Sequence, residues 1–296
     1  MVRFPGIYVA VLTPFNASQD VDYPRLRDHV DWLIANGIHG LVPTGSVGEY
    51  ASLSDDERAR VVETIVDVAA GRVPGVVGNA APATARAVAW ARHAKEVGAA
   101  GVMALPPINY RPSRREVIAH YEAVSAVGLP IIAYNNPVDY ATDLTPDLLA
   151  DMAHIENLVA VKEFSGDVRR IPAILDQTNL EVLVGVDDLV VEGFLAGATG
   201  WIAGMTNVIP GESVHLLDLL KAGRLDDARS LYRNLLPLMH FDAEPYLVQA
   251  MKYGCELIGR PLGQTRPPRL PLEEQERRSV EQALVRARAA GTAILT

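Results

Sequence analysis

The sequence predicts one (β/α)8 TIM barrel with a C-terminal helical extension. Short apolar runs rich in Val and Ile alternate with longer amphipathic segments. This is the pattern of parallel strands buried on both faces and of helices that return the chain. Eight such runs favour a closed barrel over an open sheet. With 296 residues and 49% hydrophobic content, a single domain of this kind can bury its core.

The predicted strands are short, and glycines bound most of them. In chain order they are residues 7–13, 40–43, 75–78, 101–105, 131–134, 159–163, 182–185 and 200–203. The amphipathic segments between them predict helices, among them residues 23–35, 55–69, 84–97, 114–126 and 146–152. Ser54 and Thr145, which precede two of these helices, have the chemistry of N-caps.

The chain continues beyond the eighth predicted strand. From about Glu212 its pattern indicates the eighth barrel helix and roughly three further helices, interrupted by an extended segment, 260–272, that contains four prolines. We therefore assign residues 1–222 to the barrel and 223–296 to a helical extension of the same domain.

Composition excludes several classes of function. The 36 acidic and 27 basic side chains give a formal charge of -9, which repels nucleic acid. No run of eighteen apolar residues predicts a membrane span, and the N-terminal segment lacks the pattern of a signal peptide, so we expect a cytoplasmic protein. The single cysteine, Cys255, is expected to pack in a helix.

Lys162 is the first candidate for chemistry. Only four lysines occur, and Lys95, Lys221 and Lys252 fall on helical patterns, where solvated or snorkelling lysines are ordinary. Lys162 instead follows an apolar run that predicts a buried strand. Burial favours the uncharged, nucleophilic amine, which can condense with a ketone and stabilise an adjacent carbanion. Alternatively, Lys162 ends its strand outside the barrel, paired with Glu163 or Asp167.

Three other segments follow predicted strands, at the end where barrel active sites lie. Gly45, Ser46 and Val47 form a turn whose amides can bind a carboxylate, and the Ser46 hydroxyl adds a donor. Tyr134 can relay a proton at the barrel mouth, or it can be a packed core tyrosine. The turn that begins at Gly185, GVDD at 185–188, is expected to cap the next helix.

Together, GSVGE at 45–49, YNNP at 134–137, VKE at 161–163 and GVDD at 185–188 resemble the dihydrodipicolinate synthase / N-acetylneuraminate lyase family over nearly the whole chain. The resemblance implies a barrel with a C-terminal helical extension, assembled as a homotetramer that is a dimer of dimers.

The resemblance also implies roles for individual residues. Lys162 is then the Schiff-base lysine, Tyr134 the proton-transfer tyrosine, and Ser46 with Val47 the carboxylate-binding turn. The implied partner is a small 2-oxo acid, with no organic cofactor and no metal. We expect the substrate-binding residues to be Gly45, Val47, Gly185, Asn109 and Asp139.

Two departures argue against synthase activity. Asp139 stands where the synthase has an arginine that holds the second substrate's carboxylate. Val47 and Asn109 stand where the synthase extends its hydroxyl relay through a threonine and a tyrosine of a neighbouring subunit. Tyr110, one residue away, can still supply a phenol. Tyr140 and Asn207 are further candidates for the distal pocket.

The second half of the chain most resembles 1-pyrroline-4-hydroxy-2-carboxylate deaminases, so we predict release of 2,5-dioxopentanoate and ammonia from that cyclic imine. Three alternatives stay open: a 2-keto-3-deoxy sugar acid dehydratase or pyruvate-releasing aldolase, 4-hydroxy-tetrahydrodipicolinate synthase, and a catalytically silent barrel that binds an oxo acid. A metal-dependent aldolase is disfavoured because the seven histidines show no ligand pair.

Overall fold

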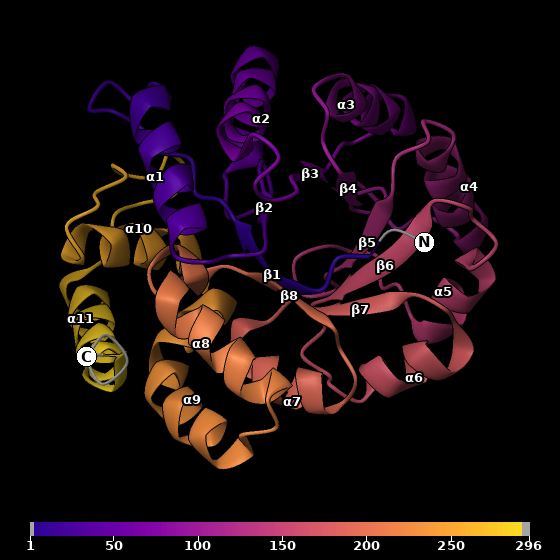
Figure 1. The fold of residues 1–296 in the computed structure, drawn as a ribbon. Coiled ribbons are helices and arrows are strands. Elements are labelled where there is room, and N and C mark those ends of the chain that lie inside the picture. Colours follow the sequence, from indigo (N-terminus) through magenta and orange to yellow (C-terminus); the bar gives the residue numbers. More distant parts are fainter. Residues whose placement is uncertain (1–2, 292–296) are drawn as a thin grey trace.

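The computed structural model, which describes residues 3–291, confirms the predicted barrel. Eight parallel strands form its centre and helices surround them (Figure 1). The strands are β1 Gly6–Ala10, β2 Gly40–Val42, β3 Val76–Asn79, β4 Gly101–Ala104, β5 Ile131–Asn135, β6 Leu158–Glu163, β7 Glu181–Val184 and β8 Gly200–Ala203. Their order, β2-β1-β8-β7-β6-β5-β4-β3, is that of successive neighbours around a ring.

The edges of this sheet, β2 and β3, meet and close the ring. Leu41 and Gly75 form a parallel bridge, and the amide of Leu41 donates to the carbonyl of Pro74 at 3.0 Å. The amide of Gly78, in β3, also donates to the carbonyl of Pro43, directly after β2, at 2.8 Å. Closure leaves no free strand edge in the barrel.

The predicted strand boundaries lie within one residue of the observed ones except in the first strand. That prediction was wrong at its end, because β1 stops at Ala10 rather than at residue 13. The amide of Leu12 bonds to Asn207 Oδ1, and the Thr13 hydroxyl donates to the carbonyl of Gly48 at 2.7 Å. This segment stays buried and apolar after it leaves the ladder, so its composition resembles a strand.

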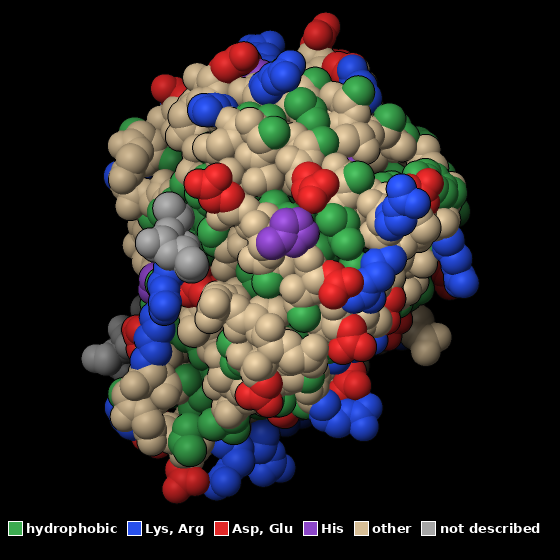
Figure 2. Space-filling model, turned by 90° about the vertical axis from the view of Figure 1, so that its right-hand side faces the viewer, with side chains coloured by type: hydrophobic (Ala, Val, Ile, Leu, Met, Phe, Trp, Pro, Cys, Tyr) green, Lys and Arg blue, Asp and Glu red, His purple; other side chains and the backbone are tan. Residues whose placement is uncertain are grey.

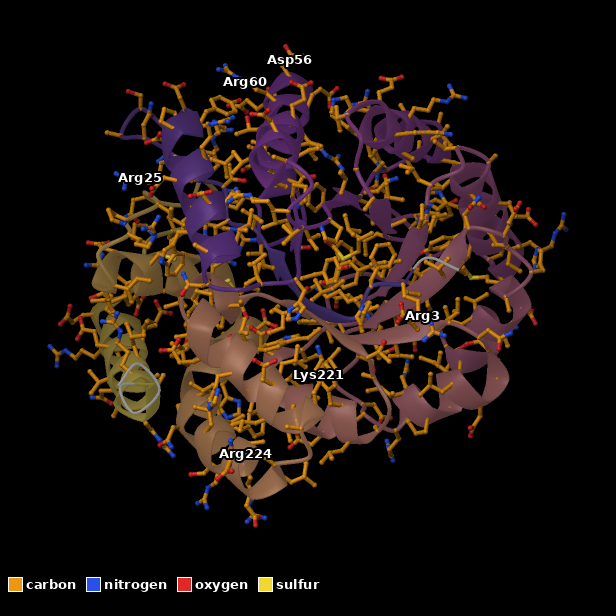
Figure 3. The ribbon with its side chains drawn as sticks, in the orientation of Figure 1. Arg3, Arg25, Asp56, Arg60, Lys221 and Arg224 are labelled. Atoms are coloured by element: carbon orange, nitrogen blue, oxygen red, sulfur yellow. The ribbon has the colours of Figure 1, made fainter. Side chains whose placement is uncertain are left out.

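The helices that return the chain are α1 Tyr23–Ala35, α2 Asp55–Ala69, α3 Thr84–Glu96, α4 Arg114–Ser125, α5 Pro146–Met152, α6 Arg170–Gln177, α7 Val190–Leu195 and α8 Pro210–Lys221. Ser54 forms a capping box with Glu57, and the Thr145 side chain accepts from the amide of Leu148, so both predicted N-caps are confirmed. On α1 and α2 the side chains of Arg25, Asp56 and Arg60 face outward (Figure 3), whereas Arg58 of α2 is buried.

Three helices follow the barrel, as predicted: α9 Leu225–Met239, α10 Leu247–Leu257 and α11 Glu274–Gly291. The expected boundary after residue 222 falls in the turn between α8 and α9, and residues 292–296 lie outside the described part of the chain. α9 packs on α8 and α11, and α10 lies beside α1 in the view of Figure 1. The segment 260–272 between α10 and α11 contains no helix or strand, as predicted, but it is not extended throughout, because residues 267–269 form a turn.

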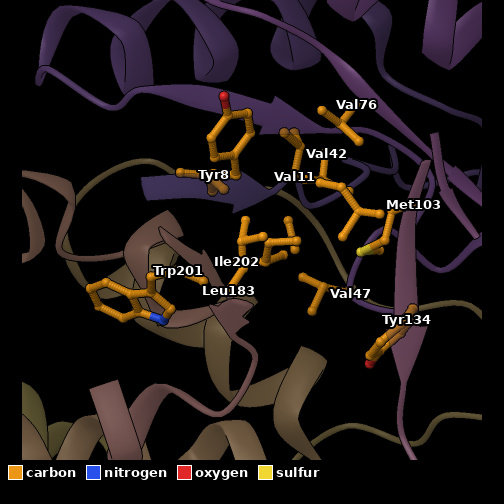
Figure 4. Close-up of a cluster of buried hydrophobic side chains, with 14 of the residues drawn as sticks. Tyr8, Val11, Val42, Val47, Val76, Met103, Tyr134, Leu183, Trp201 and Ile202 are labelled. Atoms are coloured by element: carbon orange, nitrogen blue, oxygen red, sulfur yellow. The ribbon is translucent and has the colours of Figure 1, made fainter. Parts of the chain in front are cut away.

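The core fills the barrel and the space between barrel and helices. Figure 4 shows Trp201 on one side of a buried cluster, with Val47, Met103 and Tyr134 on the other. Cys255 is fully buried, which confirms its predicted packing role. Within residues 3–291, no helix is both long and apolar enough to span a membrane. On the face shown in Figure 2, acidic and basic side chains are interspersed.

The expectation that Lys252 is solvated or snorkelling was wrong. Its amine forms an ion pair with Glu49 at 2.8 Å, and the two side chains are 3% and 2% exposed. Lys252 also donates to the carbonyl of Gln264 at 3.2 Å, and the other Glu49 oxygen accepts from the amide of Arg266 at 3.1 Å. This buried pair joins α10 and the segment 260–272 to the turn after β2.

Replacing Lys252 alone should therefore be costly. Lys252→Met leaves the Glu49 carboxylate buried without its cation, and we expect the free energy of unfolding to fall by about 3–5 kcal/mol. Denaturant unfolding measures the loss. The double variant Lys252→Met with Glu49→Gln should regain much of it, and Lys221→Met, at an exposed helical lysine, is the matched control. Equal losses in the single and double variants would contradict the ion pair's role.

Candidate active site

Neighbouring strands bring Lys162 and Tyr134 together. The two residues are partners in the ladder between β5 and β6. Lys162 is 6% exposed, and its Nζ lies 4.2 Å from the centroid of the Tyr134 ring and 5.3 Å from that of Phe164. Such a position over an aromatic face stabilises a cation and excludes water from one side of it. The alternative of an exposed Lys162 is wrong.

The acids proposed as its outer partners are engaged elsewhere. Glu163 accepts from Asn135 Nδ2 at 2.9 Å and from the amide of Ser165 at 2.7 Å, and burial raises its pKa. Asp167 pairs with Arg169 at 2.7 Å. Lys162 is thus held by packing rather than by a direct ion pair with either neighbour in sequence.

Gly185 makes room for the lysine stem. A Cβ at this position would lie 2.9 Å from Lys162 Cε and 2.8 Å from the carbonyl oxygen of Glu163. Both distances are shorter than real Cβ contacts. Position 185 therefore requires glycine because any side chain there would collide with Lys162. The predicted contact of Gly185 with substrate stays a prediction.

The turn after β2 lies at the same end of the barrel. Gly45 and Ser46 line a small inner cavity together with Tyr134 and Met103. Val47 is buried in the core. The Ser46 hydroxyl is 3.1 Å from the phenol of Tyr140, a contact that sequence reasoning missed because the two residues lie 94 positions apart. Ser46 and Tyr134 are therefore brought to one cavity, as expected.

A larger cavity adjoins this inner one. Its volume is about 660 Å³, within the usual range for small-molecule sites. It is lined by Ser46, Glu49, Tyr50, Ala51, Ser52, Tyr140, Pro245, Gln249, Arg266, Pro267, Pro268, Arg269 and Leu270. Ser46 and Tyr50 line both cavities. Lys162 lines neither of them and lies next to Tyr134, which lines the inner one.

Of the residues expected in the distal pocket, Asp139 lies close to the catalytic candidates, whereas Asn109 and Tyr110 do not. Asp139 accepts from Asn136 Nδ2 at 2.8 Å, and the same nitrogen donates to the Tyr134 hydroxyl at 3.1 Å, so Asp139 joins the tyrosine through one amide. Asn109 and Tyr110 are exposed on their loop and line neither cavity. The structure therefore does not bring Asn109 to the other candidates.

Asn207 is buried away from both cavities. Its Nδ2 donates to the carbonyls of Ala10 and Gly204, each at 2.8 Å. Its Oδ1 lies 3.0 Å from His29 Nε2, and burial lowers the pKa of His29 to about 4. Asn207 therefore stabilises the ends of β1 and β8 and does not line the distal pocket.

Two buried carboxyls stand near Lys162, and one corrects a prediction. Asp187 does not cap the following helix; it accepts from Trp201 Nε1 at 2.8 Å and from the amide of Met205 at 2.6 Å. Its own amide donates to Asp242 at 3.2 Å. Burial raises the pKa of Asp187 to about 6 and raises that of Asp242 well above its usual value, while the charge of Lys162 opposes both shifts.

Sequence reasoning missed Asp242 because it comes from the extension, after α9. A lone acid next to an apolar helix end was the only sequence signal. Because burial raises the pKa of both carboxyls, this pair retains a proton more readily than two solvated acids would.

The comparison with protein families gives one match across the chain. The model of the dihydrodipicolinate synthetase family matches residues 3–287. A 4-hydroxy-tetrahydrodipicolinate synthase of Methanospirillum hungatei is 35% identical over 286 residues, covering 94% of this chain and 96% of that protein. One of Syntrophobacter fumaroxidans is 36% identical over 287 residues, covering 95% and 98%.

Solved structures agree. The 4-hydroxy-tetrahydrodipicolinate synthase of Methylacidiphilum fumariolicum has a TM-score of 0.94 at 27% identity, covering 99% of this chain and 98% of that one. The dihydrodipicolinate synthase of Aquifex aeolicus has a TM-score of 0.92 at 29% identity, covering 96% and 98%. The similarity includes the C-terminal helices as well as the barrel.

The Gly185 contact gives a direct test of the lysine's position. In Gly185→Ala the new methyl group must push Lys162 or the Glu163 carbonyl aside, at a cost of about 1–3 kcal/mol in stability. Borohydride reduction in the presence of pyruvate should then label the folded variant at Lys162 about tenfold less than the parent, a change of about 1.4 kcal/mol. Mass spectrometry of the Lys162 peptide measures it.

Gly211→Ala is the matched control, because its Cβ would meet nothing closer than 3.7 Å. It should label like the parent. Full labelling of folded Gly185→Ala would mean that the stem of Lys162 does not depend on this glycine.

Proposed function

The chain belongs to the dihydrodipicolinate synthetase family, and from this premise we propose that Lys162 is the residue through which it forms a Schiff base with a small 2-oxo acid. The chain is an enzyme of this family of Schiff-base lyases. One observation carries the proposal: the Lys162 amine is buried against the Tyr134 ring instead of being paired in solvent.

The proposed mechanism needs an amine, a group that moves protons and a turn that binds the substrate carboxylate. The uncharged amine adds to the C2 carbonyl, water leaves, and an iminium remains. Removal of a C3 proton then gives an enamine, because the iminium accepts the electron pair. The Tyr134 phenol, on the neighbouring strand, is proposed to move these protons, and the Gly45–Ser46–Val47 turn to hold the substrate carboxylate.

The names of the relatives support 4-hydroxy-tetrahydrodipicolinate synthase as the first candidate for the overall reaction. In this reaction the C3 carbon of the pyruvate enamine would attack the aldehyde of aspartate semialdehyde. The amine of the second substrate would then displace Lys162 at C2 and close the ring. One water is lost for each ring formed.

A second candidate rests on Asp139. An acid joined to the Tyr134 hydroxyl through Asn136 repels a second carboxylate, which favours a substrate with a hydroxyl or amine at its far end. The predicted deaminase has such a substrate. Lys162 would open the ring at C2, and the C4 hydroxyl would leave as water together with a C3 proton. Proton shifts from C5 and its amine to C3 and C4 would then give an imine at C5. Hydrolysis of the imines at C2 and C5 would release 2,5-dioxopentanoate and ammonia and free Lys162. This stays a prediction, as do the homotetramer and the cytoplasmic location.

A substrate panel distinguishes these reactions. We expect borohydride with pyruvate to add a fixed mass at Lys162, and one of four assays to show turnover. The assays follow consumption of pyruvate with aspartate semialdehyde, ammonia release from 1-pyrroline-4-hydroxy-2-carboxylate, water loss from a 2-keto-3-deoxy sugar acid, and pyruvate release from N-acetylneuraminate.

Lys162→Ala should lose every activity, whereas Lys95→Ala, at an exposed lysine of α3, should keep them. Ammonia release would establish the deaminase, and joint consumption with aspartate semialdehyde the synthase. Absence of label at Lys162 with retained turnover would refute the Schiff-base proposal.

Tyr134→Phe separates proton transfer from imine formation. It keeps the ring over the lysine and removes only the hydroxyl, so turnover should fall by about 10²–10⁴-fold while trapping at Lys162 persists. Steady-state kinetics and the borohydride label measure the two effects. Tyr23→Phe, on α1 and outside the lining of both cavities, is the matched control. Unchanged turnover in Tyr134→Phe would remove this phenol from the mechanism.

A further inference from the structure

The side-chain amide of Asn136 is held in one orientation beside Tyr134. Asn136 directly follows β5, two positions after Tyr134, so the alternation of a strand sends both side chains to one side. Asn136 Nδ2 donates to the Tyr134 hydroxyl at 3.1 Å and to the Asp139 carboxylate at 2.8 Å. Asn136 Oδ1 accepts from the backbone amide of Asp139 at 3.0 Å. Asp139 therefore binds both ends of this amide.

A flipped amide cannot make these contacts. After a flip, Oδ1 of Asn136 would face the Asp139 carboxylate, and Nδ2 would face the backbone N–H of Asp139. Acceptor would then oppose acceptor, and donor would oppose donor, at distances of 2.8 and 3.0 Å. Asn136 is 1% exposed, so water cannot satisfy the mismatched groups. Asp139 thus fixes the amide with an N–H group toward Tyr134.

This orientation decides which way the Tyr134 proton points. A phenol oxygen that accepts from Asn136 carries its own proton on another side. In the part of the chain that the structure describes, that proton has no acceptor, and Lys162 Nζ lies over the ring face, 4.2 Å from the centroid. Tyr134 lines the inner cavity together with Ser46. The proton is therefore free for a substrate held there.

We propose that Asn136, held by Asp139, is a positioning residue that turns the Tyr134 proton toward the substrate on Lys162. The proposal rests on the Schiff-base function above. When Tyr134 gives its proton to C3 of the enamine, C3 forms a bond to hydrogen, the iminium returns, and the electron pair of the O–H bond stays on the phenol oxygen. The Asn136 N–H then faces a phenolate, and a hydrogen bond to a charged acceptor is stronger than one to a neutral acceptor. The reverse step returns the proton to Tyr134.

Hydrogen exchange into pyruvate tests this role in the native protein. Pyruvate is given in deuterium oxide, NMR follows the loss of its methyl protons, and borohydride trapping at Lys162 is measured in parallel. Asn136→Leu keeps the branched shape of the side chain and removes both N–H groups. We expect it to trap pyruvate like the parent but to exchange about tenfold more slowly. Asn234→Leu, on α9 and outside the lining of both cavities, is the matched control.

Asp139 gives a second test, because it is exposed and its substitution leaves the core intact. Asp139→Asn keeps an oxygen that can accept from Asn136, so exchange should match the parent. Asp139→Leu removes that acceptor, and exchange should fall about three- to tenfold, the rate equivalent of one hydrogen bond. Should Asn136→Leu fold poorly, the difference between these two variants decides.

A double variant separates positioning from packing. If Asn136 acts through the Tyr134 hydroxyl, adding Asn136→Leu to Tyr134→Phe should slow exchange no further than Tyr134→Phe alone. A residue that only supports the fold would instead lower exchange in both backgrounds and reduce trapping as well.

Parent-like exchange in folded Asn136→Leu, a further loss in the double variant, or equal exchange rates in the two Asp139 variants would overturn the positioning role and leave the Schiff-base function intact. Failure of the parent to trap pyruvate would instead refute that function, and the positioning role with it.

Discussion

The burial of one amine between two neighbouring strands is the constraint on which the site depends. Lys162 and Tyr134 are ladder partners, so their contact is set by the register of β5 and β6 rather than by a mobile loop. Gly185 supplies the space for the lysine stem, and burial raises the pKa of the nearby carboxyls of Asp187 and Asp242 against the opposing charge of Lys162. A chemically useful lysine here is therefore a consequence of barrel closure.

The C-terminal extension is part of this site, although the barrel alone carries the lysine. It contributes Asp242 near Lys162 and Pro245, Gln249 and Arg269 to the outer cavity. The Glu49–Lys252 pair then fixes α10 to the turn that holds Ser46. Because a buried pair is seldom a net source of stability, its value here lies in setting the position of that turn. The ion pair therefore couples the position of the extension to that of the turn.

Sequence alone predicted the elements that local patterns specify. Apolar periodicity gave all eight strands and the capped helices, and the scarcity of lysine with an apolar run before it singled out Lys162. The errors share one cause, since they concern partners distant in sequence. Nothing local shows that Lys252 pairs with Glu49, that Asp187 bonds to Trp201 instead of capping a helix, or that Ser46 meets a tyrosine 94 positions away.

The prediction of where the first strand ends was wrong for a related reason. Residues 11–13 are as apolar as a strand, but they are buried by contacts with Asn207 and Gly48 beyond the ladder. Burial and strand pairing produce the same composition, so only the three-dimensional contacts separate them.

The charged residues at the mouth of the barrel affect which of the family's reactions this site favours. Asp139 lies one amide away from the Tyr134 hydroxyl, where a cation would be needed to attract a second carboxylate. Arg266, at the outer cavity, is committed to Glu57 at 2.6 Å and to the carbonyl of Gln19, and this pairing lowers the pKa of Glu57 to about 2. A dicarboxylate adduct would therefore have to draw its positive charge from Arg269, whereas a substrate with a neutral or basic far end meets a compatible acid.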